Sequence, residues 1–223
     1  MRFLFFAILL AFFCNSPLAP ANVMAQELEL EGPVLPEPEQ PDENAIQPEI
    51  DDVPLVSEDT RTQAEKRLAE LFKDLKKTRN NRAAKRISDE IWGEWFRSGS
   101  ASIDLMMKWS NEAVANEKYN IALDYLDQVV TLMPEFAEGW NRRATLHYTM
   151  SNFSKSMADI QKVLALEPRH FGALSGMATI LERSGKKQAA LKAWQRALSV
   201  YPAMPSGQAA IIRLSEELEG DPA

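Results

Sequence analysis

Apolar residues recur along the second half of the chain at intervals of three and four positions, with polar residues between them. This spacing places the apolar side chains on one face of a helix. Short stretches with turn chemistry interrupt the pattern at 116–118, 151–152 and 184–186. From residue 103 onwards the sequence therefore predicts a series of short amphipathic helices joined by tight turns, and the fold class is all-α.

The helical pattern repeats with a period of 34 residues. A proline closes each unit, at Pro134, Pro168 and Pro202, because the residue before a proline disfavours the helical region. The three units are 103–136, 137–170 and 171–204, and each is predicted to hold two helices. An internal period of this length indicates helical pairs stacked in a solenoid.

Small residues stand at two positions of every unit, the eighth and the twentieth, where paired helices must approach closely. Larger apolar residues are predicted to face them across the pair. The small residues are Ser110, Ala144, Ala178, Ala122, Ser156 and Ala190, and the facing ones are Leu126, Ile160, Trp194, Val129, Val163, Ala197, Leu132, Leu166 and Val200.

Both ends of the array are expected to be covered. Residues 205–223 contain an amphipathic helix that would cap the last unit and a short tail. Extending the 34-residue phase backwards places Phe72, Leu75, Trp92 and Trp95 on core sites, although no proline closes that segment. Residues 61–102 are therefore predicted to be a degenerate N-terminal repeat that caps the first unit.

The arrangement resembles the tetratricopeptide repeat (TPR) family, most clearly in the middle unit. Three positions depart from the family pattern, namely Arg143, Ser156 and Trp109. The resemblance implies a right-handed superhelical solenoid with a C-terminal capping helix, whose concave face binds a peptide from another protein. The residues that carry it are Trp140, Ala144, Tyr148, Phe153, Ile160, Val163, Leu164, Leu166 and Pro168.

The resemblance also implies which residues line the concave groove, since the family uses fixed positions of each first helix. Lysines at one end would suit a partner with an acidic end, and asparagines would bond a peptide backbone. A cap for Asn141 and a core position for Met107 are the alternatives. The candidate groove residues are Lys73, Lys77, Asn80, Met107, Asn111, Glu138, Asn141, Thr145, Tyr148, Thr149, Ser175, Thr179, Glu182 and Arg183.

The N-terminal part of the chain has a different composition. Residues 1–25 join Arg2 to a short apolar run and end in Ala25, which predicts a secretory signal cut before Gln26 or near Ala21. Residues 26–60 hold 12 acidic residues, 6 prolines and no Lys or Arg, which predicts an acidic disordered spacer. Cys14 follows two phenylalanines, a poor site for lipid attachment, and a mature chain cut before Gln26 would have no cysteine.

These features favour a non-catalytic adaptor that binds partner polypeptides, secreted and by family analogy periplasmic. No phosphate loop, nucleophile elbow or metal motif is present, no cofactor is expected, and His147 and His170 are interpreted as structural. Nucleic acid is not expected as a partner, because acidic residues interrupt the basic stretch 66–86. Beyond the signal segment no membrane contact is predicted. A monomer is favoured, the alternative being a structural envelope protein that self-assembles through Trp92 and Trp95.

Overall fold

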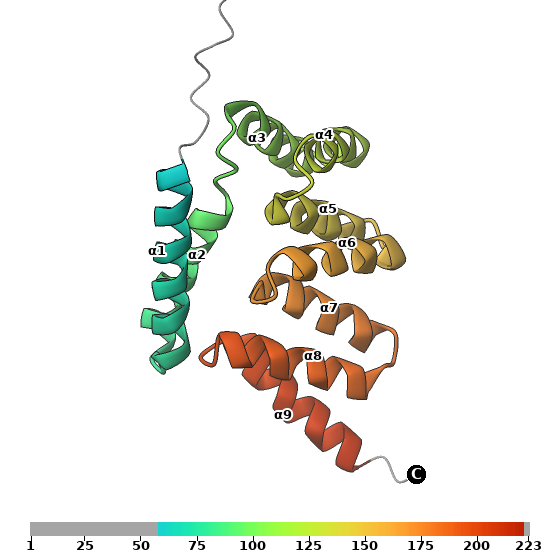
Figure 1. Cartoon of the computed structure of the whole chain (residues 1–223). Coiled ribbons are helices and arrows are strands. Elements are labelled where there is room, and N and C mark those ends of the chain that lie inside the picture. The colour runs from blue at the N-terminus through green and yellow to red at the C-terminus, as the bar shows by residue number, and fades with distance from the viewer. Residues whose placement is uncertain (1–57, 221–223) are drawn as a thin grey trace, which may run out of the picture. The chain divides into compact units, whose positions relative to one another are not determined.

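The computed structural model describes residues 58–220, which form nine α-helices and no strand (Figure 1). The predicted signal at 1–25 and residues 26–57 of the predicted spacer lie outside the described residues. The spacer prediction was wrong for residues 58–60, which belong to the first helix. No helix in the described range is both long and apolar enough to cross a membrane. The helices are α1 (Glu58–Lys77), α2 (Asn81–Trp95), α3 (Ala101–Ala115), α4 (Tyr119–Leu132), α5 (Ala137–Thr149), α6 (Phe153–Leu166), α7 (Phe171–Arg183), α8 (Lys187–Val200) and α9 (Pro205–Glu219).

Helices α3 to α8 fall two to each 34-residue unit and stack as successive antiparallel pairs (Figure 1). The second helix of each pair, α4, α6 or α8, ends two residues before the proline that closes the unit. Inside each unit a residue with a left-handed backbone lies two positions after the end of the first helix, at Glu117 (φ 58°), Ser151 (φ 61°) and Gly185 (φ 69°). The next N–H then bonds back into the helix, as Lys118 N does to the Ala113 carbonyl at 2.8 Å. The left-handed residues in the turns therefore recur with the same 34-residue period as the helices.

The small residues lie where the helices of a pair cross, and all six are buried. Ser156 uses its hydroxyl there, because Oγ donates a 2.7 Å hydrogen bond to the Ala144 carbonyl of the facing helix. Leu126, Val129 and their equivalents in the later units are also buried, as predicted. The prediction was wrong for Leu132 and Leu166, which are 67% and 43% exposed. Each is the last residue of its helix, where the chain turns away from the pair.

Helix α9 covers the end of the array, as predicted. Ala210 and Leu214 are buried in the same cluster as Trp194 of α8. Gly207 permits the close approach, because a Cβ there would stand 2.8 Å from Leu198 Cδ2. The all-α solenoid of stacked helical pairs with a C-terminal capping helix is confirmed.

Helices α1 and α2 form a hairpin, which we call the N-terminal hairpin. Its buried residues, including Leu75, Ile91 and Trp95, share one core cluster with residues of α7, α8 and α9. The core of α3 is separate and is built with α4, Phe136 and α5. A capping repeat would stack on α3, whereas this hairpin packs its aromatic face on the third unit. The connection at 96–100, with Gly99 at φ 81°, leads from the hairpin to α3.

Candidate functional site

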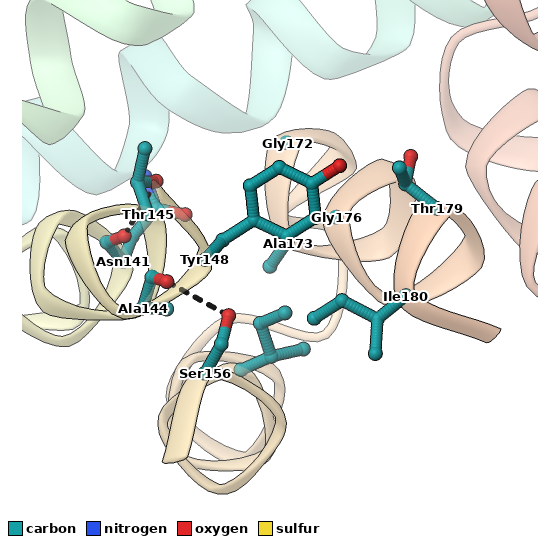
Figure 2. Close-up of a pocket in the computed structure, with 11 residues that line it drawn as sticks. Asn141, Ala144, Thr145, Tyr148, Ser156, Gly172, Ala173, Gly176, Thr179 and Ile180 are labelled. Carbon is teal, nitrogen blue, oxygen red and sulfur yellow. Dashed lines mark hydrogen bonds between the residues drawn. The ribbon is translucent and has the colours of Figure 1, made fainter. Parts of the chain in front are cut away.

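A cavity of about 180 Å³ opens between α5, α6 and α7 (Figure 2). Ala144, Ile160 and Ile180 give it an apolar interior, while the hydroxyl groups of Tyr148 and Thr179 add polar atoms to the lining. Gly176 helps to keep it open, because a Cβ at that position would already touch Ile160 Cδ1 at 3.4 Å. The arrangement suits an apolar side chain whose backbone stays near polar groups.

Four of the predicted groove residues, Asn141, Thr145, Tyr148 and Thr179, line this cavity. A smaller cavity of about 70 Å³ lies between α3 and α5, and Asn111, Thr145 and Thr149 are among its lining residues. Thr145 lines both cavities. The structure therefore brings the central predicted residues together along one side of α5.

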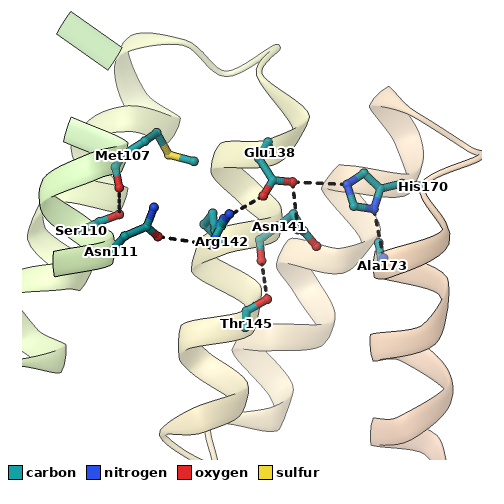
Figure 3. Close-up of polar contacts among 9 residues, drawn as sticks. All are labelled: Met107, Ser110, Asn111, Glu138, Asn141, Arg142, Thr145, His170 and Ala173. Atoms are coloured by element: carbon teal, nitrogen blue, oxygen red, sulfur yellow. Dashed lines mark hydrogen bonds and ion pairs between the residues drawn. The ribbon is translucent and has the colours of Figure 1, made fainter. Parts of the chain in front are cut away.

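Glu138 ties three first helices together through contacts that we call the Glu138 network (Figure 3). Its side chain is 1% exposed. Glu138 Oε1 accepts from Arg142 Nε at 2.8 Å, and Oε2 accepts from Asn141 Nδ2 at 2.9 Å. Arg142 Nη1 donates to Asn111 Oδ1 of α3 at 3.2 Å, and His170 Nε2, before α7, lies 3.4 Å from Glu138 Oε2. The side chain of Glu138 is therefore used for contacts within the protein, and these contacts fix the shape of the groove.

His170 also caps α7, because its Nδ1 accepts a 3.0 Å hydrogen bond from the Ala173 N–H. Because Nδ1 is used in this bond, Nε2 is the ring nitrogen that faces Glu138. His170 was predicted to be structural, and its position agrees with that prediction. Arg142 was not among the predicted site residues, although it is a charged residue next to Asn141 on a first helix.

No family model matches the chain. It is 50% identical over 155 residues to a TPR repeat-containing protein of Rhizobium etli, an alignment that covers 70% of this chain and 76% of the relative. The chain belongs to the TPR family. Small glutamine-rich tetratricopeptide repeat-containing protein 2 of Saccharomyces cerevisiae is 25% identical over 97 residues, which is 44% of this chain and 28% of that protein.

Solved structures with the same TPR fold include the first TPR domain of Spaghetti (RPAP3) bound to an HSP90 peptide. It has a TM-score of 0.51 and 19% identity, and covers 54% of this chain and 96% of that one. The Sgt2 TPR domain of Aspergillus fumigatus has a TM-score of 0.50 and 16% identity, covering 56% of this chain and 87% of that one. These similarities concern the fold.

Several predicted residues lie outside the cavities of the TPR groove. Lys73 and Lys77 are exposed on α1, where Lys73 pairs with Glu70 at 3.1 Å. Asn80 caps α2 by accepting from the Ala83 N–H. Met107 is 7% exposed and belongs to the core of the first TPR unit, which was its alternative interpretation. The expected basic end of the groove is therefore not part of either of these two cavities.

The remaining candidates belong to the third TPR unit, and their side chains have partners within the chain. Ser175 Oγ donates to the Phe171 carbonyl at 2.8 Å. Glu182 accepts from Trp194 Nε1 at 2.6 Å and pairs with Arg213 of α9. The Arg183 guanidinium lies 5.1 Å from the ring centroid of Phe153.

His147, the other histidine, lies on the opposite side of α5 beside Arg143 and is 7% exposed. Burial lowers the pKa of its imidazole, and Asp159 partly offsets this effect. Arg143 bonds Asp159 through Nε and Nη2 and Asp127 through Nη1, so this cluster joins α4, α5 and α6. Within residues 58–220 no group of three or more His, Cys, Asp or Glu could hold a metal ion.

Proposed function

We propose that the protein is a non-catalytic adaptor that binds an extended segment of a partner polypeptide along the TPR groove. The observation that carries the proposal is the cavity between α5 and α7, with Ala144, Ile160 and Ile180 inside and Tyr148 and Thr179 in its lining. A cavity of this size takes one apolar side chain, and the polar groups around it suit a peptide backbone.

The similar structures add support by analogy. The Spaghetti TPR domain is bound to a peptide of HSP90. A groove of the same fold in this chain offers the same kind of surface, although the residues that line it are its own. An acidic end on the partner stays a prediction that rests on Lys73 and Lys77, and it can be tested by the salt dependence of binding.

A random peptide library displayed on phage tests the proposal without a known partner. Thr145→Arg places a long charged side chain where cavities meet, so peptides selected on the wild-type protein should lose binding by more than about tenfold. Thr131→Arg is the matched control, because Thr131 is exposed, lines neither of the two cavities and makes the same bond to the carbonyl four residues earlier. Selected peptides that bind the Thr145→Arg protein unchanged would refute the groove assignment.

We further propose that the protein works outside the cytoplasm, in the bacterial cell envelope. The support is the composition of residues 1–25, with a basic start, a short apolar run and a small residue at the expected cut. Fusion of residues 1–30 to an alkaline phosphatase that is active only after export provides the test. Activity should disappear when Leu9 and Leu10 are changed to Arg, and activity that persists with those changes would contradict export.

Self-assembly is a second candidate function, and it would use a different surface from the one predicted from the sequence. Trp92 and Trp95 are packed within the chain, whereas Leu105, Trp109 and Ile121 of the first TPR unit are 42%, 42% and 45% exposed. Sedimentation of the wild-type and Trp109→Ser proteins would decide between the two. A monomer at all concentrations supports the adaptor alone, and an oligomer that depends on Trp109 supports assembly.

A further inference from the structure

A second and wider cavity, of about 510 Å³, lies between the N-terminal hairpin and the TPR array. Asp89, Trp92 and Phe96 of α2 and its C-cap form one wall. Glu138, Asn141, Arg142 and Thr145 of α5 form the other. We call it the α2–α5 cleft. It is continuous with the TPR groove, because Asn141 and Thr145 also line the cavity between α5 and α7.

The α2 wall is held firmly against the third TPR unit. The Trp95 ring stacks on His170, and the Trp92 ring meets Phe171 edge-on with ring centroids 5.5 Å apart. The Trp92 ring can pack here only because residue 172 is a glycine, since a Cβ at Gly172 would stand 2.7 Å from the ring. The hairpin therefore forms a fixed wall that the repeat pattern does not supply.

The wall of α2 offers aromatic surface to the cleft. Trp92 and Phe96 are stacked with centroids 5.5 Å apart and planes 21° apart, and Phe96 is 41% exposed. The Arg142 guanidinium lies 4.7 Å from the Phe96 ring centroid and so joins the two walls at one point. Flat aromatic faces next to a guanidinium favour an aliphatic or aromatic side chain as ligand.

The wall of α5 has unused hydrogen-bonding capacity. Asn141 donates through Nδ2 to Glu138, which leaves Oδ1 as an acceptor. Arg142 uses Nε and Nη1 with Glu138 and Asn111, and among the described residues no bond is made by its Nη2. One open acceptor and one open donor on neighbouring residues match the N–H and C=O of an extended backbone.

The charges of the cleft are matched inside the protein. Arg142 pairs with Glu138 at 2.8 Å, and Asp89 pairs with Lys85 at 2.7 Å. A charged ligand group would therefore have to compete with a pair that already exists, whereas a neutral segment would not. Lys73 and Lys77, which would attract acidic groups, do not line this cleft.

We propose that the α2–α5 cleft binds an uncharged, extended segment of the partner polypeptide, with one large apolar side chain on Trp92 and Phe96. The backbone of that segment bonds Asn141 Oδ1 and Arg142 Nη2. The inference rests on the proposed function and makes the hairpin a second wall of the binding site. Residues of α2, as well as the TPR units, then contact the partner.

The test uses peptides selected on the purified wild-type protein from the random phage library. The sequences should share a Leu, Met, Phe or Trp flanked by uncharged residues. Synthetic peptides trimmed to that uncharged segment should bind with a Kd that changes less than about threefold between about 50 mM and about 500 mM salt. Phe96→Ser should raise the Kd by about tenfold or more, and Phe96→Leu, which keeps apolar surface, should retain most of the affinity. Leu132→Ser is the control, because Leu132 is 67% exposed and lines none of the three cavities.

The outcomes separate this inference from the proposed function. Peptides that lose binding to Thr145→Arg but bind Phe96→Ser unchanged overturn the cleft and leave the TPR groove standing. Peptides that bind both variants unchanged, or a selection that enriches none, overturn both. Acidic residues next to the shared apolar side chain, with strongly salt-dependent binding of the trimmed peptide, overturn the neutral ligand proposed for the cleft. Far-ultraviolet circular dichroism of each variant confirms that the helical fold is intact.

Discussion

The indole ring of Trp95 lies parallel to the imidazole of His170, with ring centroids 4.1 Å apart and planes 8° apart. The contact joins α2 to the residue that caps α7, and His170 is fully buried beneath it. The same imidazole faces Glu138 of α5 through Nε2. One histidine therefore connects the N-terminal hairpin, the second TPR unit and the third.

Gly172→Ala tests how the hairpin is seated. The new Cβ would stand 2.7 Å and 2.8 Å from two atoms of the Trp92 ring, so the ring or the helix must move. We expect a loss of stability of about 1–3 kcal/mol and a change in tryptophan fluorescence. Gly93→Ala is the control, since nothing lies within 4 Å of its Cβ and the substitution should stabilise α2 by about 0.5–1 kcal/mol. If the two substitutions changed the free energy of urea unfolding equally, the close packing of Trp92 on Gly172 would be contradicted.

Glu138→Gln tests the Glu138 network. The amide keeps the shape of the side chain but removes the charge that faces Arg142 and one acceptor site. Because Glu138 is buried, the free energy of unfolding should fall by about 1–3 kcal/mol. Glu135→Gln, at an exposed position three residues earlier, should change it by less than about 0.5 kcal/mol. An unaltered Glu138→Gln protein would mean that the network contributes little to the fold.

The sequence predicted the array because each TPR unit is local. Pro134, Pro168 and Pro202 mark the phase, and small residues such as Ala144 and Ser156 mark the crossing of neighbouring helices. Neither signal requires knowledge of distant contacts. This is why the helix pairs, the small residues at their crossings and the cap by α9 were placed correctly, whereas Leu132 and Leu166 at the helix ends were not.

The hairpin was harder to place, since its position depends on contacts between residues far apart in the sequence. Trp92 and Trp95 have the right spacing for a repeat core, but nothing local shows that Gly172 and His170 receive them. For the same reason Lys73 was expected in the groove. Its role was inferred from the repeat phase, which holds only where a unit stacks on the next.

The turns inside the TPR units offer a stabilising prediction. Glu117 and Ser151 adopt the left-handed backbone that Gly185 adopts in the third unit. A side chain is strained in that region, so Glu117→Gly and Ser151→Gly should each raise the free energy of unfolding by about 0.5–1 kcal/mol. Gly185→Ala should lower it by a similar amount. Chemical denaturation measures all three, and a loss of stability in both glycine variants would contradict the assigned backbone.

The buried His147 predicts a dependence of stability on pH. Its pKa is lowered from the ordinary 6.5, mainly by burial, so the folded protein binds fewer protons here than the unfolded chain. The stabilising contribution of the neutral ring is complete above pH 6.5 and is lost as the pH falls through 6.5 toward the lower folded pKa. His147→Leu should therefore gain thermal stability relative to wild type between about pH 7.5 and about pH 5. A difference in Tm that stays constant with pH would contradict this account.

The proposed groove places a partner polypeptide along α5 and α7, the first helices of the second and third TPR units. Amide hydrogen exchange of the purified protein, with and without a peptide selected on it, tests this most directly. We expect slower exchange within 137–149 and 171–183, with little change within 153–166. Slower exchange confined to 153–166, or to helices outside the groove, would contradict it.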